Sequence, residues 1–218
     1  MLKGCVLLGF LAGLLPACGS TGDVPQLRSG SVGVGSSSEL ERLIDSVHGG
    51  LVALVLDPVA PGRPHRVVLA AQVETSPAAV RRALIEVETY PDTVDQVVGV
   101  VVRERSSKRI VFDMELELPF QNLHYGLEYD IRDPLRVDVV GISGALEGGR
   151  WCWELKARND GTVVVYTSEC DLSDGSGLLL EQLLAMHPDL QEGMAFAQGM
   201  RLLRTICEQA RRLDRRDP

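Results

Sequence analysis

The sequence predicts an α+β domain in which a curved antiparallel β-sheet wraps around one long C-terminal helix. Two observations predict it. About six segments with strand-like patterns lie between residues 97 and 172, and several of them alternate apolar and polar residues. Only one helical pattern, from about residue 188 to 212, is long enough to cover a sheet. A sheet with one apolar face must bury that face against another element, so we expect this helix to pack on it.

The chain begins with features of an export signal. Lys3 is followed by an apolar run over residues 6–15, which is too short to span a bilayer. We therefore expect a signal peptide over residues 1–17. The stretch LPAC, which ends at Cys18, is similar to the lipobox of bacterial lipoproteins, although Pro16 is unusual in that motif. This similarity implies that Cys18 is the lipid attachment site. The alternative is an ordinary secretory signal that is cut nearby, with Cys18 incidental.

Residues 18–38 are rich in glycine and serine and carry only isolated apolar residues. This composition is typical of a flexible tether, with a span of roughly 25 Å for twenty residues. Gly19, directly after the cysteine, resembles the sorting pattern of outer-membrane lipoproteins. We expect a lipid-anchored protein at the periplasmic face of the outer membrane of a bacterial cell envelope, with one folded domain over residues 39–218.

Composition excludes several classes of function. The chain has 30 acidic and 22 basic residues and a net charge of −8, which argues against nucleic acid as a partner because phosphate binding requires a basic face. The five cysteines and four histidines show no spacing typical of metal ligands. We therefore expect no metal and no cofactor, and we expect a monomer.

The first half of the domain has recognisable element boundaries. A helical pattern covers residues 39–47, and two strand patterns cover 51–56 and 66–74. Ser76 is a good N-cap for a helix that begins at Pro77. That helix should end before Pro91, because a proline disfavours helical geometry at the residue before it. A short helix or turn over 92–95 and a strand over 97–105 complete this half.

The second half contains two hairpins and a further strand. Residues 110–120 and 123–131 alternate strictly, which predicts one buried and one wet face. The strand pattern over 136–142 follows. Asp160-Gly161 predicts a two-residue turn, with Trp151 opposite Cys170 and Trp153 opposite Ser168. This register also places Cys152 and Cys170 on opposite faces, so a disulfide between them is not expected.

These motifs, in this order, resemble a known superfamily over residues 65–212. The residues that carry the resemblance are Thr75-Ser76-Pro77, Ala83-Leu84, Tyr90-Pro91, the valine-rich strand after them, Trp151, Trp153, the Asp-Gly hairpin and the terminal helix. They are similar to the polyketide cyclase/dehydrase and START-like (SRPBCC) superfamily. The resemblance implies a helix-grip fold with a deep, mostly apolar cavity between sheet and helix. It also implies that the ligand is a sterol, phospholipid, quinone or polyketide. The strands before residue 75 are more similar to the START branch.

The residues expected to line this cavity are those that face inward from the sheet and the helix. They are Phe112, Met114, Leu116, Tyr125, Leu127, Tyr129, Trp151, Trp153, Tyr166, Ser168, Phe196 and Met200. A pocket for an apolar ligand has such walls and a few polar groups. The hydroxyl-bearing members are candidates to orient one polar head group. For any one of these residues, ordinary core packing is the alternative.

We expect the protein to bind a hydrophobic small molecule or lipid and to transfer it between membranes. The apolar segment 177–187 is either a lid or membrane-touching loop, or a helix packed on the core. No catalytic constellation is visible, because the carboxylates of the strand over 110–120 point outward, where Arg103 and Arg105 could pair with them. The alternatives are a cyclase-like or hydrolase-like enzyme that uses the same cavity, and a structural lipoprotein with a filled core.

Overall fold

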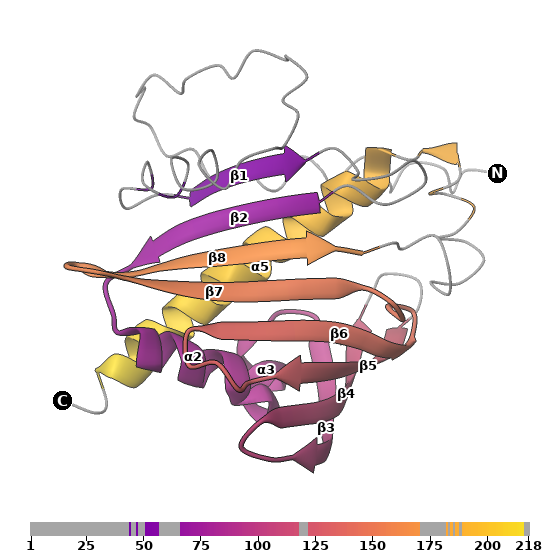
Figure 1. Cartoon of the computed structure of the whole chain (residues 1–218). Coiled ribbons are helices and arrows are strands. Elements are labelled where there is room, and N and C mark those ends of the chain that lie inside the picture. Colours follow the sequence, from indigo (N-terminus) through magenta and orange to yellow (C-terminus); the bar gives the residue numbers. More distant parts are fainter. Residues whose placement is uncertain are drawn as a thin grey trace, which may run out of the picture. The chain divides into compact units, whose positions relative to one another are not determined.

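The computed structural model describes most of one compact unit, Val34–Pro218. The described residues are 44, 47, 51–56, 66–117, 122–170, 182, 184, 186, 187 and 189–215, with side chains for all of them except 51–56 and 189. Figure 1 shows the arrangement within this unit: one broad sheet, with the long helix α5 crossing behind it and the short helices α2 and α3 near its lower edge.

The sheet has eight antiparallel strands in the order β1-β2-β8-β7-β6-β5-β4-β3. Their bounds are β1 Leu51–Leu56, β2 Arg66–Val73, β3 Val97–Arg105, β4 Arg109–Glu117, β5 Asn122–Asp130, β6 Arg136–Gly144, β7 Arg150–Arg158 and β8 Gly161–Glu169. The six strands from β3 to β8 follow one another in sequence as neighbours. The pair β1 and β2 joins through β8, which places the first strands of the domain beside the last one.

The helical excursion between β2 and β3 begins as predicted and ends differently. α2 spans Pro77–Ile85, and the Ser76 hydroxyl accepts a hydrogen bond from the Ala79 amide at 3.2 Å. A 3₁₀ turn, η1 Val87–Thr89, and a short helix, α3 Tyr90–Thr93, follow. The expectation that Tyr90 is not helical was wrong. Its side chain is 2% exposed and its hydroxyl donates to the Leu84 carbonyl oxygen at 2.7 Å, and these contacts outweigh the preference imposed by Pro91.

The long C-terminal helix is confirmed as α5, Asp189–Asp214. Its buried stripe includes Leu203, Ile206 and Ala210, none of which is measurably exposed. Gly199 lies where the helix crosses the sheet. A β-carbon there would lie 2.7 Å from Cε1 of Tyr166 and 2.9 Å from Cδ1 of Leu69, so the absence of a side chain lets the sheet approach closely.

The register of the β7–β8 hairpin differs from the prediction by two residues. Trp151 lies opposite Ser168 and Trp153 opposite Tyr166, and the closing pair is Arg158 with Gly161. The turn is therefore Asn159-Asp160 rather than Asp160-Gly161. Gly161 has φ of +139°, a backbone that side-chain-bearing residues rarely adopt, and it packs against β2. A shift of two residues keeps every side chain on its predicted face.

The strands β2 and β8 are buried on both faces. Toward α5 they contribute Leu69 and Tyr166 to the main core. On the opposite face a second cluster forms, which consists of Ile44, Val47, Val68, Ala70, Val163 and Val165. Ile44 and Val47 therefore pack on the outer face of these two strands, which explains why the central parts of their sequences are continuously apolar rather than alternating.

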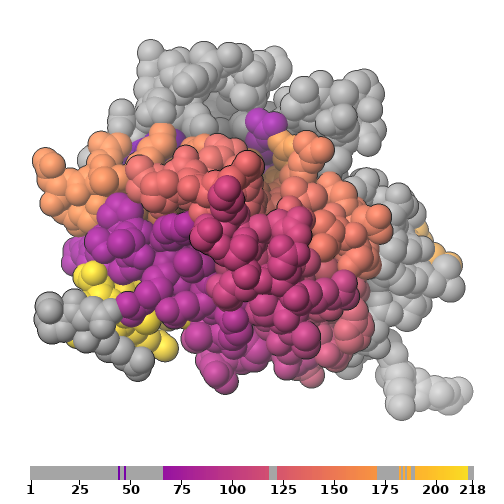
Figure 2. All heavy atoms as spheres, turned by 60° about the horizontal axis from the view of Figure 1, so that its bottom comes forward, coloured from indigo at the N-terminus to yellow at the C-terminus, as the bar shows by residue number. Residues whose placement is uncertain are grey.

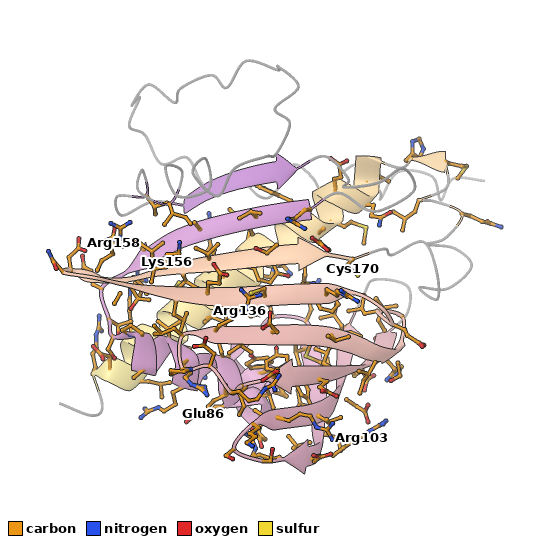
Figure 3. The ribbon with its side chains drawn as sticks, viewed as in Figure 1. Glu86, Arg103, Arg136, Lys156, Arg158 and Cys170 are labelled. Atoms are coloured by element: carbon orange, nitrogen blue, oxygen red, sulfur yellow. The ribbon has the colours of Figure 1, made fainter. Side chains whose placement is uncertain are left out.

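The outer face of the remaining strands carries charged side chains, including Arg103 and Arg136 (Figure 3). Arg103 pairs with Asp113 at 2.5 Å, as the alternation predicted. Arg105 does not pair with the sheet carboxylates and instead contacts Glu88 of η1 at 2.5 Å. These side chains are largely exposed, so each pair contributes little to stability.

Candidate ligand-binding site

The face of the sheet toward α5 brings together the residues predicted to line a cavity. Met114 lies opposite Tyr125 and Phe112 opposite Leu127 on the β4–β5 ladder. One buried core cluster contains seven of the twelve candidates, namely Phe112, Leu116, Tyr125, Leu127, Tyr129, Trp153 and Tyr166. Four more pack against this cluster, namely Met114, Trp151, Phe196 and Met200. The twelfth, Ser168, is 3% exposed on the same face of β8.

This interior is closed at the end near α2. Leu203 and Ile206 of α5, Leu84 of α2 and Val164 of β8 have no exposed surface. Figure 2 shows the C-terminal part of α5, in yellow, beside purple residues of α2. Close packing of this kind leaves no room for a ligand.

The opposite end of the interior is looser. Four of the candidates are only partly buried although they face inward: Met114, Trp151, Phe196 and Met200. Met114 lies near the end of β4, and Trp151 lies near the start of β7. The N-terminal half of α5 reaches the same end, where the Gln191 side-chain amide donates to the Cys170 carbonyl oxygen at 3.1 Å. The apolar wall is thus less completely buried where the N-terminal half of α5 meets the end of β8.

All four tyrosines of the chain are buried in this interior, and their hydroxyls differ in their partners. The hydroxyl of Tyr129 is hydrogen-bonded to that of Tyr90, which donates to the Leu84 carbonyl oxygen. Ser168 is hydrogen-bonded to Tyr166. The Tyr125 hydroxyl forms no hydrogen bond with another described residue.

Burial controls the protonation of these groups. Loss of solvation raises the pKa of Tyr90, Tyr125 and Tyr166, and it raises the pKa of Tyr129 to about 12. All four hydroxyls are therefore neutral at physiological pH. A neutral phenol can donate or accept one hydrogen bond, but it is a poor general base.

Trp151 defines one border of the open end. A β-carbon on Gly149 would lie 2.5 Å from the Cη2 atom of the indole and 3.1 Å from the Cys170 sulfur, so the ring and the sulfur pack over this glycine. Cys152 lies on the opposite face of β7, beside Arg136 and Asp138, where burial raises its pKa to about 12. Both cysteines are thiols, in agreement with the expectation that they are not bridged.

Comparisons with known proteins bear on the fold. No family model matches the chain, and no curated protein sequence matches it. Several solved structures, however, match the fold of the chain. The STAR-related lipid transfer protein from Xanthomonas axonopodis superposes with a TM-score of 0.59 at 12% identity, over 75% of this chain and 95% of that one. The chain has the START-like helix-grip fold.

Two further structures share this fold. The Thermus thermophilus protein TTHA0849 has a TM-score of 0.58 at 18% identity, over 66% of this chain and 96% of that one. The Zhui aromatase/cyclase from Streptomyces sp. R1128 has a TM-score of 0.56 at 16% identity, over 67% of this chain and 93% of that one. The fold resemblance predicted from the sequence is thereby confirmed.

The described ion pairs between β3 and β4 lie away from the interior of this helix-grip fold. The carboxylates of β4 point to the outer face, as predicted, where Asp113 pairs with Arg103 and Glu115 accepts from the Asn122 amide at 2.6 Å. Within the described ranges no group of histidines, cysteines and carboxylates could hold a metal ion. Nor is any helix in that part of the chain both long and apolar enough to cross a bilayer.

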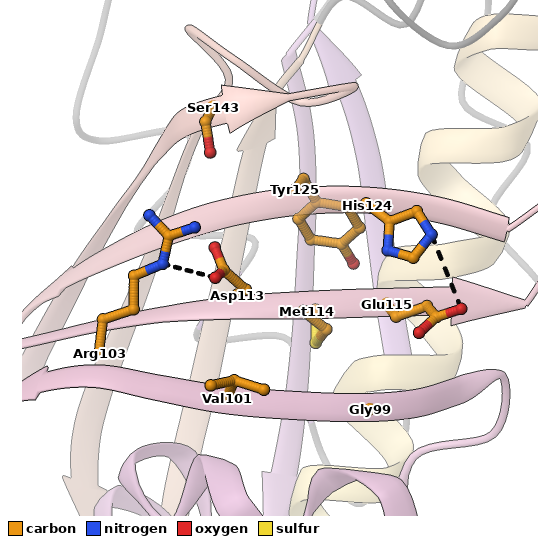
Figure 4. Close-up of a pocket in the computed structure, with 9 residues that line it drawn as sticks. All are labelled: Gly99, Val101, Arg103, Asp113, Met114, Glu115, His124, Tyr125 and Ser143. Carbon is orange, nitrogen blue, oxygen red and sulfur yellow. Dashed lines mark hydrogen bonds and ion pairs between the residues drawn. The ribbon is translucent and has the colours of Figure 1, made fainter.

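Sequence reasoning missed a pocket of about 330 Å³ on the outer face, shown in Figure 4. It is lined by Gly99, Val101, Arg103, Asp113, Met114, Glu115, His124, Tyr125 and Ser143. The imidazole Nε2 of His124 lies 3.7 Å from a Glu115 carboxylate oxygen. The hollow arises because Gly99 lies opposite Glu115 and contributes no side chain. Alternation of side chains alone could not have revealed it, because it depends on strand pairing.

Several predictions fall on residues that the structure does not describe. They concern the signal peptide, Cys18, the tether up to residue 38 and most of the segment 177–187. In that last segment Leu184 is 3% exposed and Met186 is 67% exposed. These two values fit a helix with one packed side and one solvent-facing side.

Proposed function

We propose that this protein binds a hydrophobic molecule between the sheet and α5 and carries it between membranes. The observation that supports binding is the contrast within the interior, where an apolar and aromatic wall is sealed near α2 and accessible near Trp151. If the whole interior were a close-packed core, we would expect the inward side chains here to be as fully buried as those near α2. Four of them are instead partly exposed, namely Met114, Trp151, Phe196 and Met200. The Xanthomonas structure named as a lipid transfer protein has the same fold and adds support.

The membrane part of the proposal rests on the sequence. A lipid on Cys18 and a tether over residues 18–38 would keep the domain close to the periplasmic face of the outer membrane. Proximity raises the effective concentration of a lipid ligand at the open end. We therefore propose that the bilayer supplies or receives the ligand, and that segment 177–187 contacts it.

We propose binding rather than catalysis. Nucleophilic or acid–base chemistry needs a base beside the reacting group, and the described interior offers neutral tyrosines, Ser168 and Cys170. The enzyme alternative is favoured by one finding, which is that the Zhui aromatase/cyclase has the same fold. A turnover assay with a polyketide substrate would have to show product for that alternative to replace the binding proposal.

The first test is extraction of lipid from the protein purified from its native cell type, followed by mass spectrometry. A stoichiometric apolar ligand supports the proposal and names its class. The second test is Met114→Glu, which places a charge on the inward face where a partly exposed side chain tolerates it. We expect loss of the extracted ligand with retention of the circular dichroism spectrum.

Two control variants accompany Met114→Glu. Met114→Leu conserves volume and should retain the ligand. Val101→Glu introduces the same charge on the outer face, at a side chain that is 64% exposed, and should also retain it. A folded Met114→Glu protein that keeps its ligand would overturn the assignment of the interior as the binding site.

A further inference from the structure

We infer that the bound molecule is an electrically neutral amphiphile and that the Tyr125 hydroxyl is the group that binds its polar end. This inference rests on the proposed function and specifies the chemistry of the ligand. It follows from the position, the partners and the electrostatic surroundings of Tyr125.

Tyr125 lies on the border of the accessible end. On β5 it is opposite Met114 of β4, whose inward side chain is partly buried, and opposite Gly144 of β6, which has no side chain. Figure 4 shows the Tyr125 ring next to Met114. A ligand that enters here would meet Tyr125 before it reached the sealed end at Leu203.

The Tyr125 hydroxyl is the one tyrosine hydroxyl in the described interior without a partner. The side chain is 6% exposed, so water cannot satisfy it freely. A buried hydroxyl that forms no hydrogen bond destabilises the folded state. Fully enclosed polar atoms without a partner occur elsewhere in the described part, for example at Thr75 Oγ1, Arg81 Nη1 and Gln209 Oε1, but the Tyr125 oxygen is not one of them. Its oxygen therefore keeps some accessible surface.

Tyr125 also lines the pocket of Figure 4, which contains charged side chains, but none of these charges acts on its hydroxyl. The ionisable groups that act on Tyr125 are Tyr129, Tyr166 and Cys170, which belong to residue types that are neutral at pH 7. Arg103 pairs with Asp113 and Arg109 pairs with Glu104 on the outer face. A carboxylate or phosphate placed beside Tyr125 would lack a counter-charge in an apolar site, which is costly. A hydroxyl or carbonyl group needs only the one hydrogen bond that Tyr125 can supply.

The test compares three probes that each have eighteen carbons and one double bond: oleyl alcohol, oleate and 1-octadecene. Each displaces the neutral dye Nile red from the purified full chain that carries Cys18→Ala, at pH 9, where oleate is ionised. We expect oleyl alcohol to bind at least about tenfold more tightly than oleate, which corresponds to about 1.4 kcal/mol. Tyr125→Phe should weaken oleyl alcohol about tenfold and leave 1-octadecene unchanged.

Tyr90→Phe is the matched control. It removes the same atom from a hydroxyl that already donates to Leu84, so it should lower stability without changing the order of the three probes. If oleate binds as tightly as the alcohol, or if Tyr125→Phe weakens alcohol and alkene equally, the inference is overturned and the binding site stands. If Nile red and all three probes fail to bind, the proposed function fails and the inference fails with it.

Discussion

The two ends of the interior are built from the same kinds of residue and differ in how tightly they are packed. Near α2, Leu203 and Ile206 have no exposed surface. Near the end of β8, Phe196 and Met200 of the same helix remain partly exposed. One helix is therefore tightly packed along its C-terminal half and less completely buried on the inward side of its N-terminal half. Apolar composition does not separate a core from a ligand site, whereas a gradient of packing along one element does.

The largest effect should come from truncation at the sealed end. We expect Leu203→Ala to lower the free energy of unfolding by about 3 kcal/mol, because it leaves a cavity among fully buried neighbours. Met200→Ala, one turn earlier at the accessible end, should cost about 1 kcal/mol, since part of that surface is already exposed. Urea denaturation measures both. Equal losses would mean that the two ends are packed alike and would remove the basis for the comparison.

Smaller effects on stability are expected when the two glycines of α5 are replaced by alanine. The two substitutions should have effects of opposite sign. Gly199→Ala brings a methyl group 2.7 Å from the Tyr166 ring, and the overpacking should outweigh the gain in helix propensity by about 1 kcal/mol. Gly193→Ala meets nothing within 4 Å and should stabilise the protein by about 0.5–1 kcal/mol.

The melting temperatures of the two single variants decide this prediction, with the unchanged chain as reference. If Gly199→Ala is also stabilising, the helix can move away from the sheet without cost. The crossing point would then be looser than the sealed end beside it.

The smallest effect concerns pH. Burial raises the pKa of every tyrosine in the folded state above its value of about 10 in the unfolded chain. The folded state thus holds these protons more tightly. The resulting stability is fully present below pH 10 and is lost as the pH rises through the folded pKa values. We expect a loss of only about 0.2 kcal/mol at pH 9, which steepens above pH 10.

Absorbance at 295 nm follows the ionisation of these tyrosines directly. No tyrosine of the folded protein should ionise near pH 10. A tyrosine that ionised near pH 10 would be one whose hydroxyl is solvated by water. The variants Tyr90→Phe and Tyr125→Phe would then show whether the signal comes from the sealed end or the accessible end. A signal at Tyr90 would contradict the comparison.

Much of the site could be predicted from alternation. Side chains on a strand point to opposite faces with a period of two, so the inward set from Phe112 to Tyr166 was predictable once the strands were recognised. The two-residue error in the β7–β8 register left this set unchanged for the same reason. The error changed only which residue lies opposite which, so that Trp153 lies opposite Tyr166 rather than Ser168. It arose because the position of a turn depends on which residue takes the unusual backbone conformation.

The partners of the tyrosine hydroxyls could not be predicted. Nothing local distinguishes Tyr125 from Tyr129, which share a strand, a face and a residue type. The difference is that Tyr90, from a helix outside the sheet, reaches the hydroxyl of Tyr129, while no described residue reaches that of Tyr125. The outer-face pocket at Gly99 depends in the same way on strand pairing.

The sequence by itself determined the element order, the face to which each strand residue points and the helix that covers the sheet, because these follow from local periodicity and from the need to bury one apolar face. Only the tertiary structure decided which part of that face is fully buried and which is partly buried, why a side chain at position 199 would not fit, and which tyrosine hydroxyl has no described partner. These features depend on contacts between residues far apart in the chain, and local patterns carry no information about how closely two distant surfaces approach.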